Sequence, residues 1–180
     1  MLAIVPFKGL GGAKTRLAGA LGAEERERLA VDMLERVLAA CEQAGSIRRT
    51  LLVTPHPGAF SAGRDVLVDR GTGHADAIEL ALADPRARDG VLVVMADCPL
   101  VEPEALERLV AAARPLALVP SEDGGVNALA LRPLDGFRPR FGVPASSMIA
   151  SAREAGLEPA LLKDARLAFD VDRPTDLARL

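Results

Sequence analysis

The amino-acid sequence predicts a three-layer α/β protein, in which helices cover both faces of a mostly parallel sheet. Short apolar segments of strand length alternate along the chain with longer segments in which apolar residues recur at helical spacing. The unbroken apolar segment Val91–Met95 is typical of a central strand covered on both faces. No internal repeat or low-complexity linker interrupts the 180 residues, so we expect one domain over residues 1–180.

The elements in the first half of the chain end at residues that favour turns. The expected strand Leu2–Phe7 runs into a glycine-rich loop, and the helix Glu24–Ala44 stops before Gly45. Prolines and a glycine directly after Arg49–Thr54 end the second strand. The remaining elements of this half are the strand Val66–Val68, the helix Ala75–Ala83 and the strand Val91–Met95.

In the second half, a proline in the first turn and nearby glutamates favour a helix over Pro103–Ala113. The elements expected after it are the strands Leu116–Val119 and Ala128–Leu131, the helix Ser146–Ala155, the strand Ala168–Val171 and a last helix that starts within Pro174–Leu180. Ligands of parallel sheets bind beyond the carboxyl ends of the strands. Residues that directly follow strands are therefore the first candidates for a site.

Composition excludes several classes of protein. The net charge of −3 and the absence of Trp and Tyr disfavour a nucleic-acid-binding protein. No apolar segment approaches the length that spans a bilayer, and glycines and lysines interrupt the first apolar run, so we expect a cytoplasmic protein without a membrane partner. Cys41 and Cys98 are too few for a disulfide framework. His56 and His74 have no spaced partners and are interpreted as non-catalytic.

The loop after the first strand has the composition of a phosphate-binding loop. It contains Lys8, Lys14 and Arg16, although the chain has only three lysines in all. Glycines allow backbone N–H groups to approach phosphate oxygens, which the basic side chains then neutralise. The P-loop pattern is absent because Ala13 separates Gly12 from the lysine, and the dinucleotide-binding glycine pattern fails as well. The alternative is a glycine-rich turn with solvated lysines.

Carboxylates occupy two further positions typical of a metal site. Asp97 follows the expected central strand, although a lone Asp there is more often a turn or helix cap. Asp170 and Asp172 are two residues apart on an expected strand and so share a face, while Asp172 could also cap the last helix. Together with the basic loop, these three carboxylates are suited to a Mg²⁺ ion that bridges phosphates.

Six motifs in sequence order resemble the phosphoenolpyruvate/2-phospho-L-lactate guanylyltransferases of coenzyme F-420 biosynthesis. They are Val5-Pro6-x-Lys8, Ala13-Lys14-Thr15-Arg16-Leu17, Asp97-x-Pro99, Asp123-Gly124-Gly125-x-Asn127-Ala128-Leu129, Arg140-Phe141-Gly142 and Asp170-Val171-Asp172-x-Pro174-x-Asp176-Leu177. The resemblance spans the chain from Val5 to Leu177. It implies the Rossmann-like nucleotidyltransferase fold shared with molybdopterin guanylyltransferases, and transfer of GMP from GTP to the phosphate of a small phosphorylated carboxylic acid with release of pyrophosphate.

The resemblance also implies a role for each candidate residue. Lys8, Lys14, Arg16 and Asp97 would be catalytic, and Mg²⁺ would be held by Asp97, Asp170 and Asp172. The nucleotide-binding residues would be Pro6, Lys8, Gly11, Gly12, Lys14 and Arg16. The acceptor pocket would comprise Gly125, Val126, Asn127, Gly142, Ser146 and Ser147, with both serines candidates for the acceptor phosphate.

The sequence departs from the family pattern at several places. Val126 stands where the family usually has Thr, so backbone N–H groups must replace a hydroxyl. The spacing between Gly142 and Ser146 is longer than usual, and Gly73-His74-Ala75 replaces Gly-Leu-Asn. Other readings are a nucleotidyltransferase for a different acceptor, such as a molybdopterin, or a non-catalytic nucleotide-binding domain. The choice of acceptor, the strictness for guanine and the oligomeric state, for which a homodimer is a guess, stay open.

Overall fold

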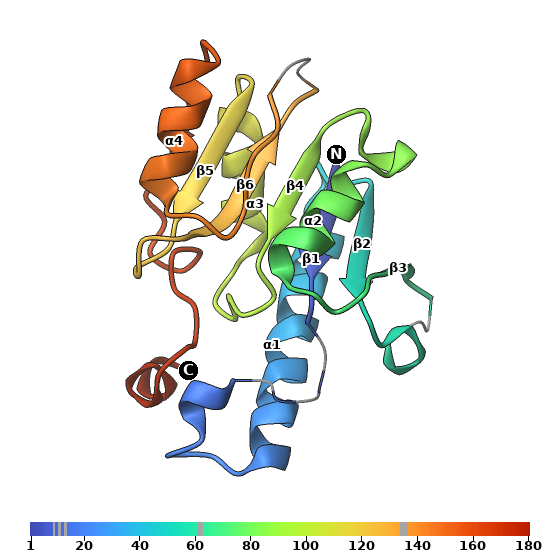
Figure 1. The fold of residues 1–180 in the computed structure, drawn as a ribbon, viewed down its shortest axis with the longest axis vertical. Helices are drawn as coiled ribbons and strands as arrows, with labels where there is room; N and C mark the ends of the chain where they lie inside the picture. The colour runs from blue at the N-terminus through green and yellow to red at the C-terminus, as the bar shows by residue number, and fades with distance from the viewer. Residues whose placement is uncertain (9, 11, 13, 61–62, 134–136) are drawn as a thin grey trace.

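One mixed sheet organises the protein, and its strands follow the order β3-β2-β1-β4-β6-β5-β7 (Figure 1). This computed structural model describes residues 1–8, 10, 12, 14–60, 63–133 and 137–180. The strands are β1 Leu2–Pro6, β2 Arg49–Thr54, β3 Asp65–Val68, β4 Val91–Val94, β5 Leu116–Pro120, β6 Val126–Leu131 and β7 Ala160–Leu161. Every pairing is parallel except the two that β6 makes. The expected α/β class and mostly parallel sheet are confirmed.

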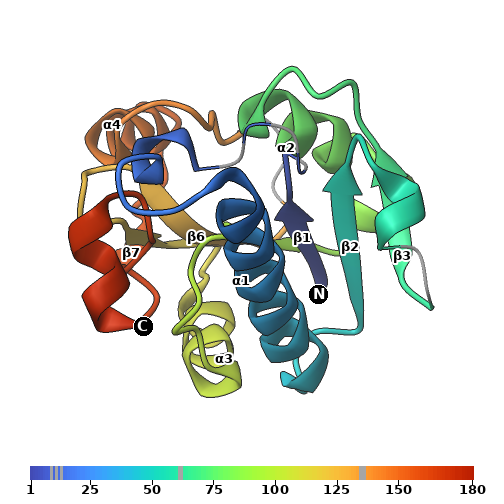
Figure 2. The ribbon, with the colours of Figure 1, turned by 90° about the horizontal axis from the view of Figure 1, so that it is seen from below.

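Helices cover both faces of the sheet because its strands are apolar on both sides (Figure 2). In β1, Ala3 and Val5 pack toward one face, and Leu2 and Ile4 pack toward the other. The first face is covered by α1 (Ala23–Gln43) and α3 (Pro103–Ala112). The second is covered by α2 (His74–Leu82) and α4 (Ala145–Glu154). None of the helices in the described ranges is both long and apolar enough to cross a membrane.

The prediction of a strand over Ala168–Val171 is wrong. The backbone of this segment makes hydrogen bonds to residues that follow β4 and β5 and does not pair with a strand. The N–H of Val171 donates to the carbonyl of Asp97 at 3.2 Å, and the carbonyl of Ala168 accepts from the N–H of Glu122 at 3.1 Å. The last strand is instead β7, a two-residue edge strand. The last helix is a short 3₁₀ helix, Pro174–Arg179, rather than an α-helix.

The reversed direction of β6 decides which loops meet at one edge of the sheet. Val94 of β4 pairs with Ala128, and the N–H of Met95 donates to the carbonyl of Asn127 at 2.9 Å. The beginning of β6 therefore lies beside the carboxyl end of β4. For this strand, the residues that face the ligand edge precede the strand rather than follow it.

A small apolar cluster joins the two ends of the chain at this same edge. Leu17, Met33, Phe169 and Val171 pack together and are almost completely buried, which brings the segment after β1 against α1 and the C-terminal segment. The guanidinium of Arg179 lies 3.8 Å from the centre of the Phe169 ring and covers its other side. We call these four apolar residues the Leu17 cluster.

Removal of the Phe169 ring is expected to lower the free energy of unfolding by about 3–5 kcal/mol, because Phe169→Ala leaves a cavity in the Leu17 cluster. Denaturant unfolding followed by circular dichroism measures this change. The matched control is Leu180→Ala, since Leu180 is 46% exposed and should cost under about 1 kcal/mol. Equal effects of the two substitutions would contradict the role of the cluster.

Candidate active site

The carboxylates expected to hold a metal lie together at the carboxyl edge of the sheet. Asp97 follows β4, and Asp170 and Asp172 come from the extended C-terminal segment. Phe169 and Val171 point into the protein, so the alternating Asp170 and Asp172 share the opposite side. One ligand oxygen from each of the three aspartates lies within 4.8 Å of the others. We call Asp97, Asp170 and Asp172 the carboxylate cluster.

Lys14 lies between two members of the carboxylate cluster. Its Nζ is 2.7 Å from Asp97 Oδ2 and 2.9 Å from Asp172 Oδ1, and its side chain is only 13% exposed. Burial acts to lower the pKa of Lys14, but the ion pairs with Asp97 and Asp172 outweigh burial and raise it. Lys14 has a φ of 49°, an uncommon left-handed conformation for a residue with a side chain. Tertiary contacts thus hold this residue in place.

Arg16 reaches the same cluster from the outside. Its Nη1 lies 2.6 Å from Asp172 Oδ2, while its side chain stays 68% exposed. Arg16 is the middle residue of the 3₁₀ helix Thr15–Leu17, whose last residue belongs to the Leu17 cluster. The apolar contact of Leu17 therefore helps to position Lys14 and Arg16, which precede it in the chain.

Asp170 is a partly buried acid of the cluster and has a raised pKa. Burial raises the pKa of Asp170 to about 6, and the charges of Asp97, Asp123 and Asp172 act in the same direction. The amide of Asn127 donates to Asp170 Oδ1 at 3.2 Å and opposes the shift. The same amide donates to the carbonyl of Ala168 at 3.0 Å, so Asn127 fixes the segment that carries the two C-terminal carboxylates.

Two cavities meet at the carboxylate cluster. The first has a volume of about 420 Å³ and is lined by basic and glycine residues of the segment after β1. The second, of about 580 Å³, lies over the start of β6 and the start of α4. His74, Met95 and Asp97 line both cavities. A group bound in one cavity would therefore lie next to a group bound in the other.

The structure separates the predicted nucleotide residues from the predicted acceptor residues. Those lining the first cavity are Lys8, Gly12, Lys14 and Arg16. Those lining the second are Gly125, Val126, Asn127, Gly142 and Ser146. Pro6 is buried at the end of β1 and Ser147 is exposed, and neither is among the residues that line these cavities. Gly11 lies outside the described residues.

The rim of the second cavity is a tight turn between β5 and β6. The Ser121 hydroxyl donates to the Asp123 carboxylate, which lowers the pKa of Asp123 and closes the turn. Gly124 has a φ of 94°, and a Cβ on Gly125 would lie 3.1 Å from Ser121 Oγ, so both positions favour glycine. The carbonyl of Gly124 accepts from Ala145 at 2.8 Å and joins the turn to the start of α4.

His74 is the first residue of α2 rather than a loop residue, and it lies on the wall that the two cavities share. Burial lowers the pKa of His74. The sequence feature that could have indicated this position is the place of His74 directly after Gly73, between an expected strand and an expected helix.

The carboxylate cluster has the donor chemistry that a magnesium ion requires. Mg²⁺ prefers hard oxygen ligands, usually one or two carboxylates together with phosphate oxygens of a substrate. The cluster provides three carboxylates that can converge, and the basic residues beside it could neutralise those phosphates. The residues present therefore fit the ion.

Comparisons with known proteins find relatives of this chain in sequence and in fold. A phosphoenolpyruvate guanylyltransferase of Sphaerobacter thermophilus is 37% identical over 189 residues, covering 99% of this chain and 91% of the relative. A 2-phospho-L-lactate guanylyltransferase of Natronomonas pharaonis is 38% identical over 178 residues, covering 98% of this chain and 83% of the relative. A crystal structure from Desulfovibrio desulfuricans G20, described as a candidate nucleotide-diphospho-sugar transferase, has the same fold with a TM-score of 0.78. It is 21% identical, and the match covers 98% of this chain and 83% of that one.

The family comparison covers the whole chain. Residues 1–180 match the family described as "Guanylyl transferase CofC like". Both guanylyltransferase relatives exceed one third identity over nearly all of the chain. This protein therefore belongs to the CofC-like guanylyl transferase family.

Proposed function

We propose that this protein transfers GMP from GTP to the phosphate of a small phosphorylated carboxylic acid, phosphoenolpyruvate or 2-phospho-L-lactate, and releases pyrophosphate. The observation that carries the proposal is the position of Asp97 on the wall between two cavities of different chemistry. Two phosphorylated substrates can meet there beside one carboxylate cluster. The names of the relatives supply the two acceptors.

The first cavity suits the triphosphate of the nucleotide. Lys8, Lys14 and Arg16 provide positive charge, and the left-handed Gly12 lets the backbone approach a phosphate without a side chain in the way. As the bond from the α-phosphorus to pyrophosphate breaks, negative charge accumulates on the leaving group. These basic side chains stabilise that charge.

The second cavity suits the phosphorylated acid. It is bordered by the turn at Gly124 and Gly125, by Gly142 and by Ser146 in the first turn of α4. N–H groups at the start of a helix are directed outward and favour an anion. An acceptor phosphate oxygen held here attacks the α-phosphorus and forms the new P–O bond, and no base is needed because that oxygen is already ionised.

Asp97, Asp170 and Asp172 would hold Mg²⁺, which when bound neutralises phosphate charge and orients both substrates. Asn127 keeps Asp170 in position for this task. Lys14, which pairs with Asp97 and Asp172, would then turn toward the triphosphate. A cytoplasmic location, a homodimer and a place in coenzyme F-420 biosynthesis stay predictions.

Pyrophosphate release is expected only when GTP, Mg²⁺ and one of the two phosphorylated acids are all present. The measurement is a coupled pyrophosphate assay over each of the four nucleoside triphosphates, with and without each acceptor. Mass spectrometry of the guanylylated acid confirms the product. Equal release without an acceptor, or none under any condition, would contradict the proposed function.

Asp97→Asn should reduce kcat/KM by at least about a hundredfold while the protein stays folded, because it removes one carboxylate at the junction of the cavities. The matched control is Asp32→Asn on the exposed side of α1, which should leave activity unchanged. Steady-state kinetics and thermal unfolding of both variants test this. Activity of the Asp97 variant within threefold of wild type would count against a metal-dependent reaction.

The affinity for a divalent ion is expected to rise as the pH increases through about 6. Because burial raises the pKa of Asp170 to about 6, this carboxyl group is largely protonated below that pH and cannot act as an anionic ligand. Titration with Mn²⁺ at pH 5 to 7.5, followed by electron paramagnetic resonance, measures the effect. Asp170→Asn should bind Mn²⁺ more weakly and lose most of this pH dependence. A wild-type affinity that does not change across this range would refute the assignment.

A further inference from the structure

Basic side chains already engage the oxygens that a metal ion in the carboxylate cluster would use. Lys14 Nζ lies 2.7 Å from Asp97 Oδ2 and 2.9 Å from Asp172 Oδ1. Arg16 Nη1 lies 2.6 Å from Asp172 Oδ2. Both oxygens of Asp172 and one oxygen of Asp97 therefore take part in ion pairs. A metal ion that used these oxygens would have to share them with an ammonium or a guanidinium group.

The ammonium group of Lys14 lies where a bridging cation would lie. A cation that joins Asp97 to Asp172 has to contact an oxygen of each, and Lys14 Nζ makes both of these contacts. One oxygen from each carboxylate of the cluster lies within 4.8 Å of the others, so a divalent ion and the ammonium would be close neighbours there. Their like charges repel strongly because the side chain of Lys14 is only 13% exposed, which leaves little water to screen them.

The side chain of Lys14 can leave this position while its backbone stays in place. The backbone is held because Lys14 directly precedes the 3₁₀ helix Thr15–Leu17, whose Leu17 is completely buried. The ammonium group is carried by a flexible four-carbon stem. Lys14 also lines the first cavity, together with Lys8 and Arg16. A triphosphate in that cavity would offer the ammonium anionic oxygens in exchange for the two carboxylates.

We propose that Lys14 occupies the position of the divalent ion until the nucleotide binds, and that the triphosphate draws the ammonium away so that the ion can take its place. This exchange rests on the proposed function, because it places the nucleotide in the first cavity. It keeps Asp97 and Asp172 paired with a cation before and after the nucleotide binds. The free protein therefore binds a divalent ion weakly, and the ion enters together with the nucleotide.

Removal of the ammonium group should strengthen metal binding, even though Lys14 is itself a candidate catalytic residue. A site that is open only about 1–10% of the time binds its ion about ten- to a hundredfold more weakly than one that is always open. Lys14→Met should therefore bind Mn²⁺ at least about tenfold more tightly than wild type. Electron paramagnetic resonance at pH 7.5 without nucleotide measures both affinities. Equal or weaker binding by Lys14→Met would overturn the inference.

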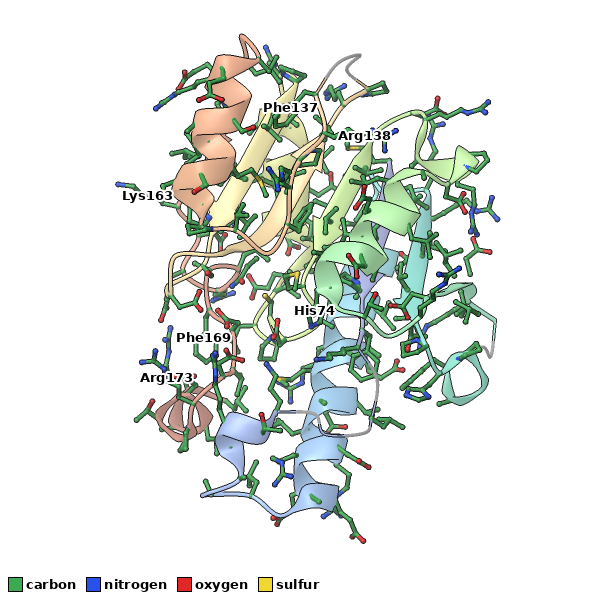
Figure 3. The ribbon with its side chains drawn as sticks, viewed as in Figure 1. His74, Phe137, Arg138, Lys163, Phe169 and Arg173 are labelled. Carbon is green, nitrogen blue, oxygen red and sulfur yellow. The ribbon has the colours of Figure 1, made fainter. Side chains whose placement is uncertain are left out.

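Two further variants separate occupation of the site from a general effect of charge. Lys163→Met removes the same charge from an exposed side chain that points outward at the edge of the molecule (Figure 3), and it should bind Mn²⁺ as wild type does. Arg16→Met removes a charge that is paired with Asp172 alone, so it should strengthen Mn²⁺ binding less than Lys14→Met does. If either variant matches Lys14→Met, charge alone explains the gain and the inference is wrong.

The exchange can also be observed in the wild-type protein by NMR. The chain has three lysines, so labelling lysine with ¹³C and ¹⁵N gives three Cε–Nζ signals, which Lys14→Met and Lys163→Met assign. Mg²⁺ should move the Lys14 signal away from that of an ammonium held by two carboxylates, and GTP should lower the Mg²⁺ concentration that is needed. A Lys14 signal that stays unchanged at Mg²⁺ concentrations that displace Mn²⁺ from the protein would contradict the exchange.

The double variant Lys14→Met with Asp97→Asn locates the ion. It should lose the tighter Mn²⁺ binding of Lys14→Met, because one carboxylate of the cluster is then absent. If the double variant keeps that affinity, the ion binds elsewhere and the inference is wrong. Failure of the proposed function would give a different result: no mixture of substrates would release pyrophosphate, while the titrations with metal alone would still show whether Lys14 competes with the ion.

Discussion

The site depends on one set of ion pairs, in which the ammonium group of Lys14 lies between the carboxylates of Asp97 and Asp172. These pairs join residues that are 83 and 158 positions apart in the sequence. Partly buried charges are stable only when they are paired. The positions of the loop after β1 and of the C-terminal segment therefore depend on each other. The Leu17 cluster makes the same connection with apolar contacts. Opposite charges and packing therefore converge on one edge of the sheet.

Much of the fold could be predicted from the sequence because apolar periodicity and turn residues determine it locally. The strand Arg49–Thr54 was predicted with its observed bounds, and the long first helix to within one residue at each end. The segment Ala168–Val171 misled the prediction, since Phe169 and Val171 alternate with polar residues as in a strand. Its backbone is instead bound by Glu122, Asp97 and the Asn127 side chain. Such long-range partners leave no local pattern.

In the candidate site, too, locally determined features could be predicted and features that depend on long-range contacts could not. The position of Asp97 after a strand and the Asp-x-Asp spacing correctly indicated carboxylates that converge, although the segment that carries Asp170 and Asp172 is not a strand. The role of Asn127 as a support for Asp170 could not be predicted, since it depends on β6 running against its neighbours. The place of His74 on the wall between the two cavities could not be predicted either, because those cavities exist only in the folded protein.

The reversed strand β6 also divides the molecule into two parts that can change independently. Strands β1 to β4 form a continuous parallel unit that carries the basic loop, while β5 and β6 form a hairpin that carries the rim of the second cavity. An insertion or substitution in the hairpin turn leaves the register of the parallel unit untouched. Selection can therefore alter the rim of the second cavity without disturbing the basic loop.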